Sequence, residues 1–109
     1  MKKVIKNGQV AVLYSPGYGA GWSTWSDNKF TETLLFHPLI VEKVESGHEN
    51  EITTEWLVEQ FGEEYEDVYC GGAKDLKINW IDQGSRFRVN EYDGFETIIL
   101  MDNDYYFIA

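Results

Sequence analysis

Three glycines and three large aromatic residues stand within nine positions near the start of the chain, in the segment 17–25. Spaced glycines let backbone N–H groups approach a bound anion closely, and aromatic faces stack on planar rings. The segment therefore predicts an ordered loop that holds a ring and a phosphate through Tyr18, Gly19, Gly21, Trp22 and Trp25. The alternative is that the aromatic residues fill the core and that the glycines permit a tight chain reversal.

A second glycine-rich connection, 69–74, has an aromatic residue before its two glycines and a cation after them. Two such loops can form two walls of one pocket. An anionic ligand in an acidic protein also needs cations, and the second half of the chain has few. The residues that this reasoning adds to the predicted ligand site are Gly71, Gly72, Lys74 and Arg88. The alternative for Arg88 is a solvent-facing position on a strand, beside neighbouring carboxylates.

Residues that could catalyse a reaction are few and isolated. His37 adjoins Pro38, which starts a predicted helix, and His48 lies in a polar turn, so neither has the spacing of a metal ligand or of a nucleophile's base. Cys70 is the only cysteine, which excludes an internal disulfide and a cysteine-based zinc cluster. We therefore expect no catalysis, no metal and no cofactor. An enzyme that uses Cys70 or His37 is the last alternative.

The chain is strongly acidic, with 19 Asp and Glu against 9 Lys and Arg and a formal net charge of −10. This balance argues against a nucleic-acid partner, because phosphate binding needs clustered Lys and Arg. Ten carboxylates and one cation, Lys43, fall between Glu42 and Asp67. A small, negative domain can occupy a basic cleft meant for nucleic acid, so a second hypothesis is an acidic protein-binding inhibitor. The alternative is that these charges only keep the domain soluble.

The 109 residues, 43% of them apolar, predict a single domain over 1–109. Its fold class is α+β: an N-terminal strand, two short helices, then a C-terminal antiparallel β-meander. No apolar run reaches the length of a membrane span, and no signal-peptide core follows the first lysines, so we expect an intracellular protein. The expected segments are a strand at 9–14, helices from Pro38 to Gly47 and at 51–61, and strands at 76–80, 87–91, 95–101 and 105–108.

Three segments, Val10–Trp25, Gly71–Trp80 and Arg86–Gly94, resemble a family of small uncharacterised proteins encoded by bacteriophages and prophages, with a loop of the type SPGYGAGWSTW. The resemblance covers nearly the whole chain and implies a setting in the cytoplasm of the infected host cell. Small accessory phage proteins often counter host defence, either by sequestering a nucleotide-derived signal or by plugging a defence protein. We therefore expect an anti-defence homo-oligomer that sequesters a nucleotide-like ligand without turnover. The alternative is an acidic protein-binding inhibitor of a host defence protein, one form of which is a nucleic-acid mimic.

Overall fold

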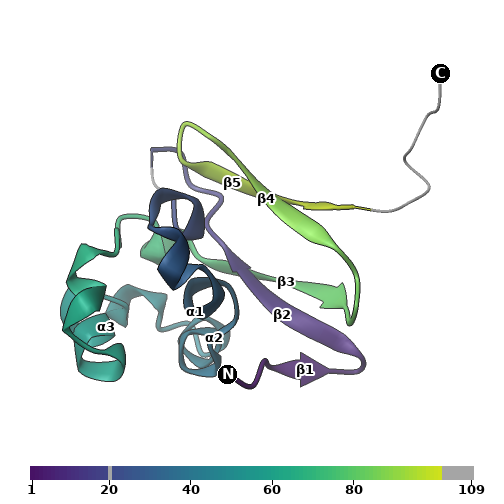
Figure 1. The fold of residues 1–109 in the computed structure, drawn as a ribbon, viewed down its shortest axis with the longest axis horizontal. Helices are drawn as coiled ribbons and strands as arrows, with labels where there is room; N and C mark the ends of the chain where they lie inside the picture. The colour runs from purple at the N-terminus through teal and green to yellow at the C-terminus, as the bar shows by residue number, and fades with distance from the viewer. Residues whose placement is uncertain (20, 102–109) are drawn as a thin grey trace.

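The computed structural model of the chain describes residues 1–19 and 21–101 and has the predicted mixed α+β architecture. Figure 1 shows the helices gathered on the left and the strands on the right. The strands are β1 (Ile5–Lys6), β2 (Gln9–Tyr14), β3 (Lys77–Asp82), β4 (Phe87–Tyr92) and β5 (Phe95–Leu100), and the α-helices are α1 (Thr31–Phe36), α2 (Pro38–Glu45) and α3 (Thr54–Phe61). Short 3₁₀ helices connect them: η1 (Ser23–Trp25), η2 (Asn28–Phe30), η3 (Glu49–Glu51), η4 (Glu63–Asp67) and η5 (Ala73–Asp75).

Strand β2 is the centre of the molecule. It pairs antiparallel with both β1 and β3, and Ala11 lies opposite Trp80. Because alternate residues of a strand face opposite sides, Leu13 packs into the core formed with the helices, whereas Val12 packs into a second core under the β4–β5 hairpin. The predicted strand at 9–14 is thus confirmed, and its continuous apolar run reflects burial on both faces.

The β4–β5 hairpin closes on a tight two-residue turn. Asp93 and Gly94 both have positive φ, 51° and 84°, as the two central residues of a type I′ turn require. The predicted turn is confirmed. Among the described residues β4 pairs only with β5, whereas β3 pairs with β2, so the C-terminal strands form a hairpin beside the sheet rather than one continuous meander. The hairpin instead places Phe87, Val89 and Ile98 against the second core. The predicted strand at 105–108 lies outside the described residues.

Helix α2 begins and ends where the sequence predicts. Pro38 occupies its first turn, the Nδ1 atom of His37 accepts the Leu39 N–H at 3.1 Å, and Gly47 turns the chain with a φ of 77°. Helix α3 begins later than predicted, at Thr54, because the Thr53 hydroxyl accepts the Trp56 N–H at 3.1 Å and caps the helix there. The residues before it form η3 rather than the first turn of α3.

Helix α1 has no counterpart in the sequence prediction. Its buried residues Leu34, Leu35 and Phe36 are consecutive, so no helical spacing of apolar residues marks it. Leu34 belongs to the core with the helices, and Leu35 and Phe36 belong to the core under the hairpin. Among the residues described, no helix has both the length and the apolar character needed to cross a bilayer.

Candidate functional site

The segment 17–25 folds against a buried carboxylate. Glu96 on β5 is 0% exposed, and its Oε2 atom accepts the backbone N–H of Trp22 at 2.8 Å and that of Thr24 at 3.1 Å. The Thr24 hydroxyl donates to the same oxygen, and Oε1 accepts the Ser15 N–H at 2.9 Å. The amides of Trp22 and Thr24, rather than those of the glycines, thus form a cradle for an anion. The anion in this cradle is a side chain of the protein itself.

The two glycine-rich loops meet directly. The hydroxyl of Ser15, a buried residue directly after β2, donates to the Gly72 carbonyl at 2.8 Å. The rings of Trp25 and Tyr69, one from each loop, lie with their centroids 5.0 Å apart. Gly71 lies under the hydroxyl end of the Tyr69 ring, where a Cβ would collide with it. The loops thus hold each other in place through direct contacts.

Trp22 is a core residue, so its predicted role in stacking a ligand is wrong. The side chain is 0% exposed, and its Nε1–H donates to the Leu34 carbonyl near the end of α1 at 2.8 Å. A buried indole needs a partner for its N–H, and α1 supplies that partner. Trp22 therefore joins the loop to the helical core, as the alternative interpretation of the aromatic residues holds.

The exposed aromatic residues of the loop lie on opposite faces of the hairpin. Trp25 is 40% exposed and donates its Nε1–H to Glu91 at 3.1 Å, while the Tyr18 ring, 73% exposed, packs on Phe95 with centroids 5.0 Å apart. Glu91 pairs with Glu96, and Phe95 precedes Glu96, so Glu91 and Phe95 face opposite sides of the hairpin. Tyr18 and Trp25 thus do not enclose one ring between them.

The glycines and the cations of the predicted ligand site also lie in different parts of the fold. Gly19 has a φ of 73° and donates its N–H to the Asp93 carbonyl, which fixes the loop to the hairpin turn. Gly21 lies under the Trp25 ring, which leaves no room for a Cβ. Lys74 is exposed on η5, which packs beside η3. Arg88 lies on β4, so the structure does not bring the two predicted cations to one place.

Arg88 lines a cleft of about 450 Å³ between β4 and the chain from η1 to α1. This volume lies within the range of small-molecule sites, about 300–1,000 Å³. Of the residues predicted from the sequence, only Arg88 lies here. The other lining residues could not be grouped from the sequence, because they come from two segments joined only by tertiary packing. The lining residues are Ser23, Thr24, Asn28, Thr31, Glu32, Leu35, Phe36, Phe87, Arg88 and Val89.

In the described part of the chain, the edge of β4 opposite β5 pairs with no other strand and is therefore a free strand edge. The Met101 N–H donates to the Arg86 carbonyl at 2.8 Å, so these opposite residues form a hydrogen-bonded pair. Because such pairs alternate along an antiparallel ladder, Arg88 also bonds to β5, whereas the N–H and C=O groups of Phe87 and Val89 point away from it. No other backbone group of residues 1–19 and 21–101 bonds to these outward groups.

Two titratable groups near the loops, Glu91 and Cys70, have pKa values shifted from their ordinary values. The Gly94 N–H and the Trp25 indole hold the pKa of the Glu91 carboxyl below its ordinary value. Burial raises the pKa of the Cys70 thiol, which disfavours the thiolate that a nucleophile needs. Within the described ranges, no three His, Cys, Asp or Glu side chains are grouped so as to hold a metal ion.

Comparisons of the chain with protein-family models, with curated proteins and with solved structures give no match. The resemblance to small phage proteins stays a prediction. We therefore infer a function from the cleft, from the free edge of β4 and from the charge of the surrounding surface.

Proposed function

We propose that the protein binds a small nucleotide-like ligand, without turnover, in the cleft between β4 and α1. The observation that carries the proposal is the free edge of β4, where the N–H and C=O groups of Val89, a residue that lines the cleft, point away from β5. A purine carries adjacent donors and acceptors on its ring edge, so it can satisfy both backbone groups as a neighbouring strand would. A ligand that covered these groups without bonding to them would leave them unsatisfied, which is costly.

The other walls of the cleft suit the remaining parts of a nucleotide. Leu35 and Phe36 on α1 and Val89 on β4 supply apolar surface for the faces of a base. The hydroxyls of Ser23, Thr24 and Thr31 can bond to a sugar, and the Glu32 carboxylate can accept from sugar hydroxyls. Arg88 is exposed at the cleft and can pair with a phosphate in a bidentate manner.

Capture without turnover needs tight, selective binding but no catalytic group. This fits the anti-defence role that the phage resemblance implies, in which a protein in the cytoplasm of the infected host cell sequesters a nucleotide-derived signal. Homo-oligomerisation belongs to the same proposal, and it is measured in the experiment below.

Native mass spectrometry of the protein purified from its host tests the proposal. We expect a stoichiometric adduct of nucleotide-like mass, released on denaturation, and the same spectrum gives the oligomeric state. Arg88→Ala should lose most of the adduct. The matched control is Arg86→Ala, which removes an exposed arginine two positions away that does not line the cleft. A protein without adduct, or equal adduct in both variants, would contradict the proposed site.

A second candidate function rests on the acidic surface of α3 and η4. The carboxylates there are exposed, and within the described ranges only Glu45 and Glu51, on α2 and η3, form ion pairs. This surface supports an acidic inhibitor of a basic host defence protein. Reversing the charges of Glu55, Glu59 and Glu63 should abolish such binding, and added salt should weaken it steeply. A complex insensitive to salt would exclude this candidate.

A further inference from the structure

The outward face of the β4–β5 hairpin is largely exposed in the described part of the chain. Because Phe87, Val89 and Ile98 pack into the second core, the alternate residues of both strands face away from it. Tyr92 among them is 78% exposed, and the hairpin lies at the end of the molecule away from α3 (Figure 1). The outward residues form four cross-strand pairs: Arg86 and Met101, Arg88 and Ile99, Asn90 and Thr97, and Tyr92 and Phe95.

The two ends of this face carry different chemistry. At the turn, Tyr92 lies beside Phe95, and the Tyr18 ring packs on Phe95 with centroids 5.0 Å apart. At the open end, Arg86 lies beside Met101, which is 47% exposed. Aromatic residues, Met and Arg are enriched at protein interfaces, and Asp, Glu and Lys are depleted there. The face thus has the composition of an interface, with aromatic rings at one end and a cation at the other.

The outward face lacks the negative charge that dominates the chain. None of its eight residues is a carboxylate, because Glu91 and Glu96 project from the other face of the hairpin and Asp93 lies in the turn. Arg86 forms no ion pair or cation–π contact within the described ranges. Two copies with a formal net charge of −10 each repel one another. They are repelled least where the local charge is positive.

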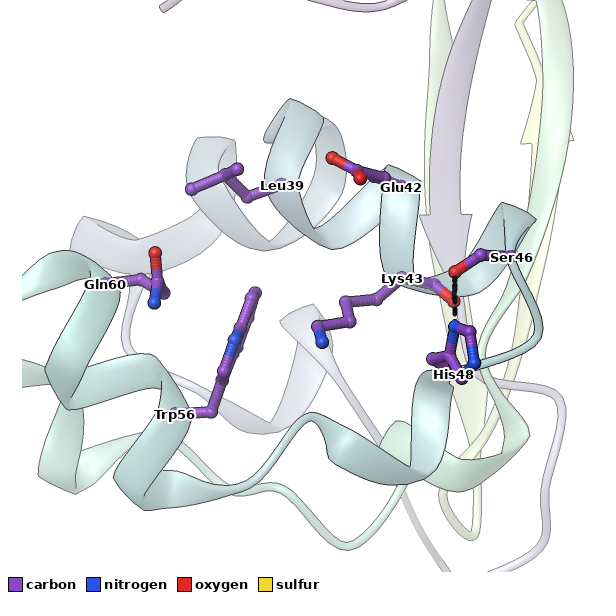
Figure 2. Close-up of a pocket in the computed structure, with 7 residues that line it drawn as sticks. All are labelled: Leu39, Glu42, Lys43, Ser46, His48, Trp56 and Gln60. Atoms are coloured by element: carbon purple, nitrogen blue, oxygen red, sulfur yellow. Dashed lines mark hydrogen bonds between the residues drawn. The ribbon is translucent and has the colours of Figure 1, made fainter.

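The helical side of the molecule opposes self-association. Figure 2 shows Glu42, Lys43, His48 and the Trp56 ring at a groove of about 270 Å³ between α2 and α3. The Lys43 ammonium in this groove already pairs with Glu51 at 2.6 Å. Helix α3 and η4 carry further exposed carboxylates, so a second copy that approached this side would meet like charge.

We infer that two copies stack the outward faces of their hairpins about a two-fold axis, with the turn of one hairpin over the open end of the other. A two-fold interface uses the same patch on both copies, and this arrangement makes the two ends of the patch complementary. It brings Arg86 of each copy over the Tyr92 ring of the other in a cation–π contact. Met101 likewise lies over Phe95 in a sulfur–aromatic contact.

The inference rests on the homo-oligomer of the proposed function and names its interface. The stacking uses side chains of the outward face, so the backbone groups on the free edge of β4 stay open to a ligand. Arg88 also lines the ligand cleft. The experiment therefore changes Arg86, which does not line it.

Sedimentation equilibrium of the full chain, without added nucleotide, tests the inference. We expect a monomer–dimer equilibrium between about 1 μM and 1 mM, the range of a small interface. Arg86→Glu should weaken the dimer at least about tenfold, because a carboxylate replaces the cation over each of two rings. The control is Lys77→Glu, which makes the same change of charge at an exposed position of β3. It should leave the dimer within about twofold of the original.

A swap of the two side chains tests the orientation of the copies. Tyr92→Arg alone should weaken the dimer, because it brings guanidinium groups of the two copies together. Combining it with Arg86→Tyr should restore the dimer, since each guanidinium again meets a ring of the other copy. A combined variant that associates no better than Tyr92→Arg alone would overturn the inference.

Two results of the sedimentation experiment would also overturn it. They are a chain that stays monomeric over the whole range of concentration, and equal losses in Arg86→Glu and Lys77→Glu. Nucleotide binding is measured separately, at the amides of Phe87 and Val89 on the free edge of β4. Failure of the inferred dimer is therefore distinguishable from failure of the proposed ligand site.

Discussion

Glu96 on β5 accepts the backbone N–H of Trp22 at 2.8 Å, although the two residues lie 74 positions apart in the chain. The same carboxylate accepts from Ser15 and Thr24, so one buried charge organises both ends of the glycine-rich loop. This explains how a segment with poor propensity for helix or strand is ordered. The amides that would otherwise need water or a ligand are satisfied by the hairpin that covers them.

Replacing this carboxylate should destabilise the whole fold. In Glu96→Gln, an amide NH₂ replaces one acceptor oxygen and faces backbone donors, so we expect a loss of about 2 kcal/mol or more in the free energy of unfolding. Urea unfolding measures it. The control is Glu91→Gln, an exposed carboxylate directly across the hairpin, for which a much smaller loss is expected. Similar losses in both variants would contradict the role of Glu96.

The two tryptophans of the loop should respond differently to truncation. Trp22→Ala removes a fully buried ring and its bond to Leu34 and should cost about 3–5 kcal/mol of stability. Trp25→Ala removes a half-exposed ring stacked on Tyr69 and should cost no more than about 1.5 kcal/mol. Thermal and urea unfolding of both variants would measure this, and equal losses would contradict the placement of Trp22 in the core.

Stability should fall on mild acidification because of His37. Burial, and then the positive N-terminus, lower the pKa of this imidazole below its ordinary value of 6.5, and its Nδ1 atom must be unprotonated to accept the Leu39 N–H. The unfolded chain therefore takes up the proton first as the pH falls. The stabilisation is full above the ordinary pKa, declines as the pH falls below it and is gone below the folded-state pKa.

Urea midpoints measured from about pH 7.5 to about pH 5.5 should show this loss. His37→Asn is the comparison, because an asparagine side chain can also cap a helix and does not titrate. The difference in stability between the original and the variant should shrink or reverse in sign toward lower pH. A difference that stays constant over the range would show that His37 does not contribute to the pH dependence.

Local sequence signals predict the elements that local chemistry determines. The strand at 9–14, the start of α2 at Pro38 and the Asp93–Gly94 turn each depend on neighbouring residues, and each is confirmed. The pairing of β3 with β2 was not predicted, because these strands lie far apart in the sequence and no local signal selects the partner. Helix α3 begins at Thr54 rather than at Glu51, because the Thr53 side chain caps it there.

The candidate site was harder to predict from the sequence, because it depends on contacts between segments that lie far apart in the chain. The sequence marks the segment 17–25 as unusual, but the amides of Trp22 and Thr24 bind Glu96, a residue on a distant strand. Nothing in the composition shows that a carboxylate of the chain occupies this cradle. Likewise, the free edge of β4 depends on the register of the hairpin and on the order of the strands in the two sheets, and neither is visible in the sequence. Arg88 was selected for its charge alone, and the structure places it at the cleft.

Nucleotide binding at β4 is tested most directly by an NMR titration of the full protein with AMP and with ADP-ribose, following the backbone amide signals. We expect the amides of Phe87 and Val89, on the free edge of β4, to shift together and saturate with at least one of these nucleotides. Arg88→Ala should weaken the binding, and Arg86→Ala should not. Absence of any saturable shift at these two amides with both nucleotides, or shifts confined to other surfaces, would contradict nucleotide binding at this edge.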